Sequence, residues 1–186
     1  MNKLTPEIIS WAQKGVVPPA LKIAAAMEES GLGEFTPPGS NNWFGIKDPN
    51  GVQTETKEQT AGGVWYTIQA GFHVFKTPAD GFLYYDWLIS HGAPYAAAWR
   101  AYEASPKAVA DVEALTRAVA AKYATALSYA EALVSLEVYY QLFGYDVAPV
   151  TPERVAHVSR QVARITQSAP HHASILAMIE DLLSKL

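Results

Sequence analysis

The sequence predicts an α+β fold that is predominantly α, and three observations carry this prediction. At four places that precede helical periodicity, Ser or Thr stands directly before Pro, a pair that supplies an N-cap and then a residue whose missing N–H costs nothing in the first helical turn. Between residues 33 and 76 the helical period disappears, and Pro, Gly, Asn and Thr accumulate. Two segments in that region alternate as strands do. We therefore expect helices around one small antiparallel β-hairpin.

The Ser/Thr-Pro pairs set most of the helix starts. They are Thr5-Pro6, Thr77-Pro78, Ser105-Pro106 and Thr151-Pro152. Together with apolar periodicity they predict helices at 6–14, 18–31, 78–91, 106–126, 129–143, 152–167 and 171–185. Ser128 and Glu131 have the spacing of a capping box, which would restart a helix after the break around Ala126. Gly31 can end the second helix because glycine takes the left-handed conformation.

The hairpin is expected from the segments VQTETKE and GFHVFK, which have two glycines between them at positions 62 and 63. Alternation places Thr54, Thr56 and Glu58 on one face of the first strand, and Glu55 and Lys57 on the other. Only one of the two glutamates can therefore point into a given cleft. The pattern leaves open which one does.

Composition excludes several classes of function. The chain has 186 residues, 49% hydrophobic and 17% charged, which is ordinary for a well-buried globular protein. Its net charge is −4 and no run of Lys and Arg interleaves with aromatics, so nucleic acid is not an expected partner. The absence of cysteine excludes disulfides and thiolate metal sites, and the five histidines lack paired ligand spacing. We expect neither a metal nor an organic cofactor.

Two adjacent acids, Glu28 and Glu29, stand at the end of an alanine-rich helix. The partial negative charge of a last helical turn raises the pKa of a carboxyl, which suits a general acid. Cleavage of a glycosidic bond needs such an acid and a second carboxylate, and aromatic side chains usually hold the sugar. A helical wheel places Glu29 beside Lys22 and Ala25, away from the apolar stripe. Periodicity alone would thus leave Glu29 facing solvent, and it does not rank Glu29 above Glu28.

The segment VPPALKIAAAMEESGLG followed by SNNWFGIK resembles the glucosaminidase family of peptidoglycan hydrolases, glycoside hydrolase family 73. Glu-Ser-Gly alone also marks the acid of lytic transglycosylases and goose-type lysozymes, whereas its combination with the Asn-x-Phe-Gly-Ile-Lys loop is more specific. Further matches follow in the same order: TETKEQTAGG, GFHVFKTPADGFLYYDWL, APYAAAW and YATALSYAEAL. The resemblance covers residues 17–137.

This resemblance implies a lysozyme-like fold in which a small β-lobe roofs a glycan groove. It implies catalytic roles for Glu29, Glu58 and Tyr129, and substrate binding by Asn42, Phe44 and Tyr123. Glu29 matches the acid and Glu58 the second carboxylate, with Glu55 as the fallback because hairpin lengths vary in the family. The family's Asp-Pro pair before the second tyrosine is Ala126-Leu127 here. The turn that aims Tyr129 must therefore be held differently, for which the Ser128 and Glu131 cap is the candidate.

The implied activity is that of an endo-β-N-acetylglucosaminidase acting on the glycan strands of peptidoglycan. The alternatives are a lysozyme or lytic transglycosylase acting at N-acetylmuramic acid, and an inactive wall-binding or scaffold protein. No apolar run approaches the roughly 20 residues of a membrane span, and Glu7 lies where a signal peptide would have its apolar core. We therefore expect synthesis in the cytoplasm and delivery to the wall or periplasm by a holin, a phage tail or a secretion machine, most naturally as a phage or prophage endolysin.

A change in charge near residue 150 predicts two domains. The catalytic domain is expected at 1–148, and a C-terminal extension of two helices at 149–186. The extension carries two apolar stripes and a separate basic face on its first helix, typical of a helical hairpin packed on the body with its charges in water. A wall or outer-membrane contact is the alternative for that basic face. We expect the protein to be a monomer.

Overall fold

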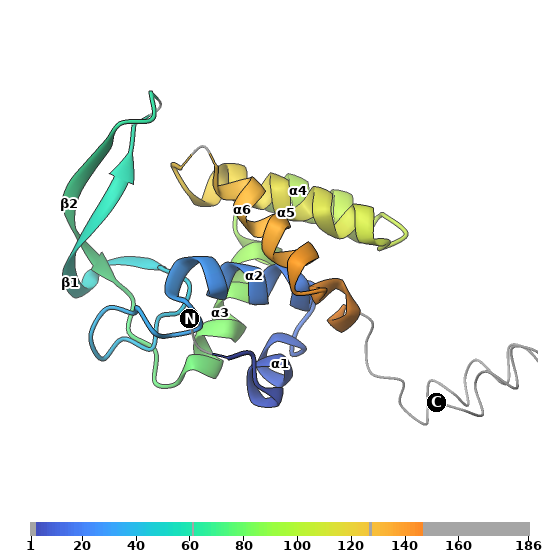
Figure 1. Ribbon diagram of the computed structural model, residues 1–186, viewed down its shortest axis with the longest axis horizontal. Helices are drawn as coiled ribbons and strands as arrows, with labels where there is room; N and C mark the ends of the chain where they lie inside the picture. Colours follow the sequence, from blue (N-terminus) through green and yellow to red (C-terminus); the bar gives the residue numbers. More distant parts are fainter. Residues whose placement is uncertain (1–2, 61, 127, 147–186) are drawn as a thin grey trace, which may run out of the picture. The chain divides into compact units, whose positions relative to one another are not determined.

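The computed structural model describes residues 3–146, except residues 61 and 127 (Figure 1). In chain order the elements are α1 (Pro6–Ala12), α2 (Pro19–Ser30), β1 (Lys47–Gln59), β2 (Trp65–Phe72), α3 (Pro78–His91), α4 (Ala96–Glu103), α5 (Val109–Tyr123), α6 (Tyr129–Tyr139) and the 3₁₀ helix η1 (Leu142–Tyr145). This arrangement of helices and one hairpin confirms the predicted α+β class. The helices predicted at 152–167 and 171–185, and with them the extension at 149–186, lie outside the described residues.

Two of the predicted N-caps are confirmed. The Thr5 hydroxyl accepts the Ile8 N–H at 3.3 Å at the start of α1. At the start of α3, the Thr77 hydroxyl accepts the Asp80 N–H at 3.3 Å and the Asp80 carboxylate accepts the Thr77 N–H at 3.0 Å. These helices start where the sequence predicts because every group in each cap is local.

The predicted helix start at Ser105-Pro106 is wrong. Lys107 has a φ of 61°, which no α-helix accommodates, so α5 begins only at Val109. The Ser105 hydroxyl turns back to donate to the Tyr102 carbonyl at 2.8 Å. The cap comes instead from Asp111, whose carboxylate accepts the Ala108 N–H at 2.8 Å.

Helix α4 is an element that the sequence did not predict. Its N-cap residue, Tyr95, forms no side-chain cap, so the usual start signal is absent. What holds the helix is burial of Trp99 and Tyr102, which lie three residues apart on one face. The three-residue spacing of these two aromatic residues was the sequence signal that could have predicted this helix.

The predicted capping box at the start of α6 is also wrong. Ser128 has helical dihedral angles and makes no side-chain cap bond. Glu131 pairs instead with Arg117 of α5, which also binds Glu113 at 3.0 Å. The turn before α6 is closed by the backbone, with the Tyr129 N–H donating to the Ala126 carbonyl at 3.1 Å.

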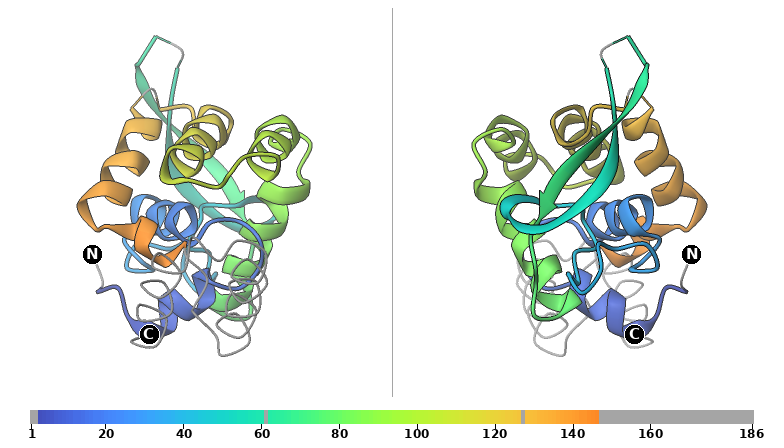
Figure 2. Two further views of the ribbon diagram at one scale, coloured as in Figure 1. Left: turned by 90° about the vertical axis from the view of Figure 1, so that its right-hand side faces the viewer. Right: turned by 90° about the vertical axis from the view of Figure 1, so that its left-hand side faces the viewer.

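Helix α2 lies at the centre of the described helices and is buried on nearly all sides (Figures 1 and 2). The expectation that the side carrying Glu29 faces solvent is wrong, because Lys22 on that side is 0% exposed. Its ammonium group lies 2.7 Å from the Asp86 carboxylate and donates to the Lys14 carbonyl at 2.6 Å. The start of α2 is capped from far along the chain, since Asp146 accepts the Ala20 N–H at 2.7 Å.

The two strands pair antiparallel, with Glu58 opposite Tyr66, and project beyond the helices as a twisted ribbon (Figure 2). The predicted alternation is confirmed, because Thr54, Thr56 and Glu58 are half-buried whereas Glu55 and Lys57 are exposed. The predicted second strand GFHVFK is wrong in its bounds: β2 begins at Trp65 and ends at Phe72. The Thr60 N–H already donates to the Val64 carbonyl at 2.9 Å, so the strands pair from Trp65 onward.

Candidate active site

Glu29 stands on the last turn of α2, where its two neighbours Ser30 and Gly31 fix its place. Gly31 takes the left-handed conformation (φ 58°) and ends the helix. The Ser30 hydroxyl lies 3.0 Å from both the Ala26 and the Trp43 carbonyls, either of which can take its proton, and it accepts the Gly33 N–H at 3.0 Å. Ser30 thus ties the helix end to the following loop.

The loop at residues 40–46 forms the floor beneath Glu29. Asn42 is 1% exposed, accepts the Ile46 N–H at 3.0 Å and donates to the Ile46 and His73 carbonyls. Phe44 is fully buried and stacks on Tyr85, with ring centroids 4.5 Å apart. Burial leaves these two predicted substrate-binding residues almost no surface to touch a sugar, so they shape the floor from beneath.

Gly45 is required at the point where the floor meets the acid. Its φ is 63°, and a Cβ atom there would lie 2.8 Å from a carboxylate oxygen of Glu29. Any larger residue would therefore be strained and would push against the carboxyl group. The glycine of the Asn-x-Phe-Gly motif lets the backbone pass directly beside Glu29.

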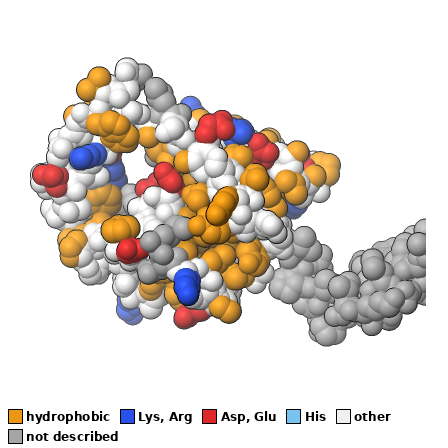
Figure 3. Space-filling model, viewed as in Figure 1, with side chains coloured by type: hydrophobic (Ala, Val, Ile, Leu, Met, Phe, Trp, Pro, Cys, Tyr) orange, Lys and Arg blue, Asp and Glu red, His pale blue; other side chains and the backbone are white. Residues whose placement is uncertain are grey.

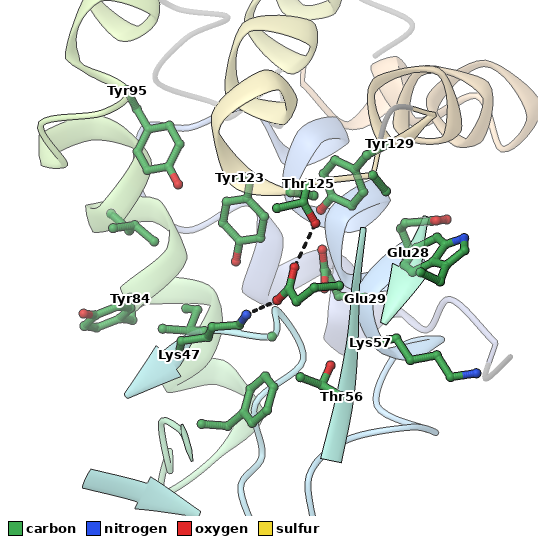
Figure 4. A pocket seen from close by; sticks show the side chains of 18 residues that line it. Glu28, Glu29, Lys47, Thr56, Lys57, Tyr84, Tyr95, Tyr123, Thr125 and Tyr129 are labelled. Carbon is green, nitrogen blue, oxygen red and sulfur yellow. Dashed lines mark hydrogen bonds and ion pairs between the residues drawn. The ribbon is translucent and has the colours of Figure 1, made fainter. Parts of the chain in front are cut away.

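A cavity of about 560 Å³ brings together the predicted site residues Glu29, Glu58, Tyr129 and Tyr123 (Figure 4). It lies in the hollow between the hairpin and the helices (Figure 3). A second cavity of about 360 Å³ also borders Glu29 and Gly45, and it is lined by Phe35 and Pro37. Both cavities border Glu29, Gly45, Thr56 and Phe72, and we refer to the two together as the groove.

The environment of Glu29 favours its protonated form. Burial raises the pKa of this carboxyl to about 7, and the charges of Glu28 and Glu58 add to the rise. The Tyr129 hydroxyl and the Lys47 ammonium group act against the rise. At neutral pH a large fraction of Glu29 therefore carries a proton.

Glu58 has the opposite environment. One carboxylate oxygen forms an ion pair with Lys47, and the other accepts the Thr125 hydroxyl at 2.8 Å (Figure 4). The Lys47 contact is the main reason that the pKa of Glu58 lies below its ordinary value. Two carboxyl groups in one cavity thus have pKa values moved in opposite directions, which is the pattern of an acid paired with a charged partner. Glu55 lies on the exposed strand face and borders only the second cavity.

The two predicted tyrosines stack on each other, with centroids 6.2 Å apart and planes at 10°. The Tyr123 hydroxyl donates to the Phe44 carbonyl at 2.6 Å and so anchors the floor loop to α5. The Tyr129 hydroxyl is buried without a hydrogen bond of good geometry, and burial together with the charge of Glu29 raises its pKa. Tyr129 therefore stays protonated and available as a donor next to the acid.

Sequence reasoning missed the two residues that hold the Glu58 carboxylate, Lys47 and Thr125. Both stand inside the motifs that matched, Lys47 at the end of NWFGIK and Thr125 within YATALSYA. Lys47 reaches Glu58 from the same strand, β1, whereas the Thr125 contact depends on the way the hairpin lies against the α5–α6 connection. Within the part of the chain that the structure describes, no group of three His, Asp or Glu could hold a metal ion. No described helix is both long and apolar enough for a membrane span.

Comparison with known proteins points to the same family as the motifs. The model of the glucosaminidase family, described as mannosyl-glycoprotein endo-beta-N-acetylglucosaminidase, matches residues 5–142. No curated protein matches the chain. Among solved structures, the catalytic domain of the autolysin Auto from Listeria monocytogenes is 24% identical with a TM-score of 0.60, over 78% of this chain and 91% of that one.

Two further structures resemble the chain to a similar degree. An N-acetylmuramoyl-L-alanine amidase from Staphylococcus aureus is 26% identical with a TM-score of 0.61, over 75% of this chain and 40% of that one. A peptidoglycan hydrolase mutant from Sphingomonas sp. A1 is 24% identical with a TM-score of 0.58, over 75% of this chain and 92% of that one. The family match confirms the resemblance found in the motifs, and the structural likeness confirms the predicted fold.

Proposed function

The chain belongs to the glucosaminidase family of glycoside hydrolases, and on that premise we propose that it hydrolyses the glycan strands of bacterial peptidoglycan as an endo-β-N-acetylglucosaminidase. Two of the similar structures are described as an autolysin and a peptidoglycan hydrolase, which supports this substrate. The observation that carries the proposal is the pair of carboxyl groups in one cavity, Glu29 with a raised pKa and Glu58 with a lowered one.

Glu29 is the general acid of the proposed reaction. Its proton passes to the glycosidic oxygen as the bond to the anomeric carbon breaks, so that the departing sugar leaves as an alcohol. A pKa of about 7 suits this role, because an acid works best when its pKa lies near the working pH. Tyr129 borders the same cavity, and its hydroxyl orients groups near the reacting carbon.

Glu58 is the ionised partner. With both oxygens held by Lys47 and Thr125, its negative charge faces the cavity in a fixed position. It stabilises the positive charge that develops on the sugar ring or takes a proton from the attacking water. Its lowered pKa keeps it ionised while Glu29 is still protonated.

The groove supports cleavage within a strand. Because two cavities border Glu29, there is room for sugars beyond the one whose bond is cut. We assign that bond to the reducing side of N-acetylglucosamine, as the family resemblance implies. The biological setting of a phage or prophage endolysin remains a prediction made from the sequence.

Replacing the adjacent residues Glu28 and Glu29 one at a time tests which of them is the general acid. Glu29→Gln removes the transferable proton and keeps the shape, so wall clearing should fall by roughly a thousandfold or more, the combined loss of acid catalysis and of its placement. Glu28→Gln is the matched control, since the exposed neighbour should tolerate the same change with activity within a few-fold of wild type. Full activity in Glu29→Gln would refute the mechanism, and an inert wild-type protein would favour the scaffold alternative.

A further inference from the structure

Thr125 connects the hairpin to the helical body at the level of Glu58. It lies in the connection between α5 and α6, and its hydroxyl donates to Glu58 at 2.8 Å while it accepts the Gln59 N–H at 3.2 Å (Figure 4). These bonds join residues 67 and 66 positions apart in the sequence. One hydroxyl therefore holds both the carboxylate and the backbone beside it.

We propose that Thr125 is a positioning residue that fixes the Glu58 carboxylate over the groove by tying the end of β1 to the α5–α6 connection. This inference rests on the proposed function of Glu58 as the ionised partner. Thr125 acts through Glu58 and has no chemical step of its own.

Two residues hold the Glu58 carboxylate, one at each oxygen. Lys47, the first residue of β1, holds one carboxylate oxygen, and Thr125 holds the other. Two contacts on different oxygens fix the plane of the carboxylate, whereas either one alone would let it rotate. Because each carboxylate oxygen has two acceptor sites, both oxygens keep one site free for a water molecule or for a developing positive charge.

The hairpin needs such a tie because two strands alone have little stability. At its base the hairpin is anchored to the loop at residues 40–46, where the Asn42 amide donates to the Ile46 and His73 carbonyls at 2.8 and 3.1 Å. Glu58 lies towards the other end of the hairpin, next to the last residue of β1 and opposite Tyr66 of β2. Without the Thr125 contacts, motion of this end would carry Glu58 away from Glu29.

The charged groups around Glu58 predict how its pKa changes when the Thr125 hydroxyl is removed. Lys47 favours the ionised form, Glu29 on α2 opposes it, and Glu28 and Lys57 border the same cavity. The uncharged Tyr66 lies opposite on β2. Removing the Thr125 hydroxyl takes away one donor to the ionised form and leaves these charges in place. The pKa of Glu58 should then rise, and the acidic limb of the pH profile should move to higher pH.

Two substitutions separate the hydroxyl from the shape of the side chain. Thr125→Val keeps the shape and removes the hydroxyl, so kcat on purified peptidoglycan should fall by roughly tenfold or more, as for a lost hydrogen bond to a charged group, while KM changes less than about threefold. Thr125→Ser keeps the hydroxyl and should retain kcat within about threefold. Thr67→Val on the exposed face of β2 is the matched control and should equal wild type.

A kcat in Thr125→Val equal to that of wild type would overturn the proposal. So would a Thr125→Ser variant as impaired as Thr125→Val, since the hydroxyl would then be irrelevant. Melting temperatures of all variants check the fold, and Thr125→Ala replaces Thr125→Val if the latter does not fold.

A second readout needs no turnover. The pKa of Glu58, followed by NMR of its labelled carboxyl carbon in the full chain, should be higher in Thr125→Val than in wild type. An unchanged value would overturn the positioning role even if the protein proved inactive on every wall tested. An inactive wild type with the expected NMR shift would instead count against the proposed function alone.

Discussion

Glycan hydrolysis should slow as the pH rises through about 7, because Glu29 must carry a proton to act as the acid. At pH 7 a glutamate with the ordinary pKa of 4.5 is protonated in roughly 1 in 300 molecules, whereas Glu29 is protonated in about half. Its protonated fraction falls from about nine tenths at pH 6 to about one tenth at pH 8. We therefore expect kcat/KM to drop about tenfold across those two pH units.

The assay measures initial release of reducing ends from purified peptidoglycan between pH 4 and pH 9 at fixed ionic strength. Glu58→Gln should remove the acidic limb of the profile and keep a basic limb, moved to lower pH, because that limb belongs to Glu29 and the Glu58 charge is one cause of its raised pKa. A basic limb near pH 5, or a rate that stays constant to pH 9, would refute the assignment of a buried, protonated Glu29.

The free energy of unfolding should also depend on the ionisation of Glu29 and should fall as the pH rises. Because the pKa of Glu29 is higher in the folded chain than in the unfolded chain, its contribution to stability is fully present below about pH 4.5 and is lost as the pH rises through 7. Glu29→Gln avoids this loss. At pH 8 it should therefore be more stable than wild type by about 2 kcal/mol, a figure reduced for partial solvent exposure, and the difference in urea unfolding should shrink towards pH 4.

Three further predictions concern the floor, the core and the groove. Gly45→Ala should lower stability by about 1–2 kcal/mol through its left-handed backbone and reduce kcat by displacing Glu29; an active variant with an unchanged melting temperature would contradict the close approach. Lys22→Met should cost about 3 kcal/mol in denaturant unfolding because Asp86 is left buried without its cation, and a loss below about 0.5 kcal/mol would show the pair to be unimportant. Phe35→Ala, at the second cavity, should raise KM for long glycans several-fold with little change in kcat; an unchanged KM would exclude that cavity from binding.

The parts of the fold that sequence could predict are those held by near neighbours. The caps at Thr5 and Thr77 and the alternation along β1 depend on residues within a few positions of each other. The predicted cap at Ser128 failed because Glu131 found a stronger partner, Arg117, on another helix. The burial of Lys22 was likewise invisible, since its partner lies on α3 and no helical wheel contains it.

In the site, too, residues close in sequence could be predicted and contacts between distant elements could not. The family resemblance of the motif around Glu29 and of the hairpin indicated two carboxyl groups, with Glu55 as the fallback for Glu58, and the structure brings Glu29 and Glu58 into one cavity. What sets their ionisation is tertiary: burial beneath the hairpin for Glu29, and Lys47 with Thr125 for Glu58. Periodicity predicted an exposed Glu29 because it could not include the loop and the hairpin that cover the end of α2.

The identity of the new reducing end in digested peptidoglycan tests the central claim most directly. Wall material is digested by the full chain, the fragments are reduced with borohydride, and the terminal sugars are identified by mass spectrometry. The proposed glucosaminidase leaves N-acetylglucosamine at the reducing end, converted to its alditol, and the products are absent with Glu29→Gln. Reducing-end N-acetylmuramic acid or an anhydro-sugar would contradict it.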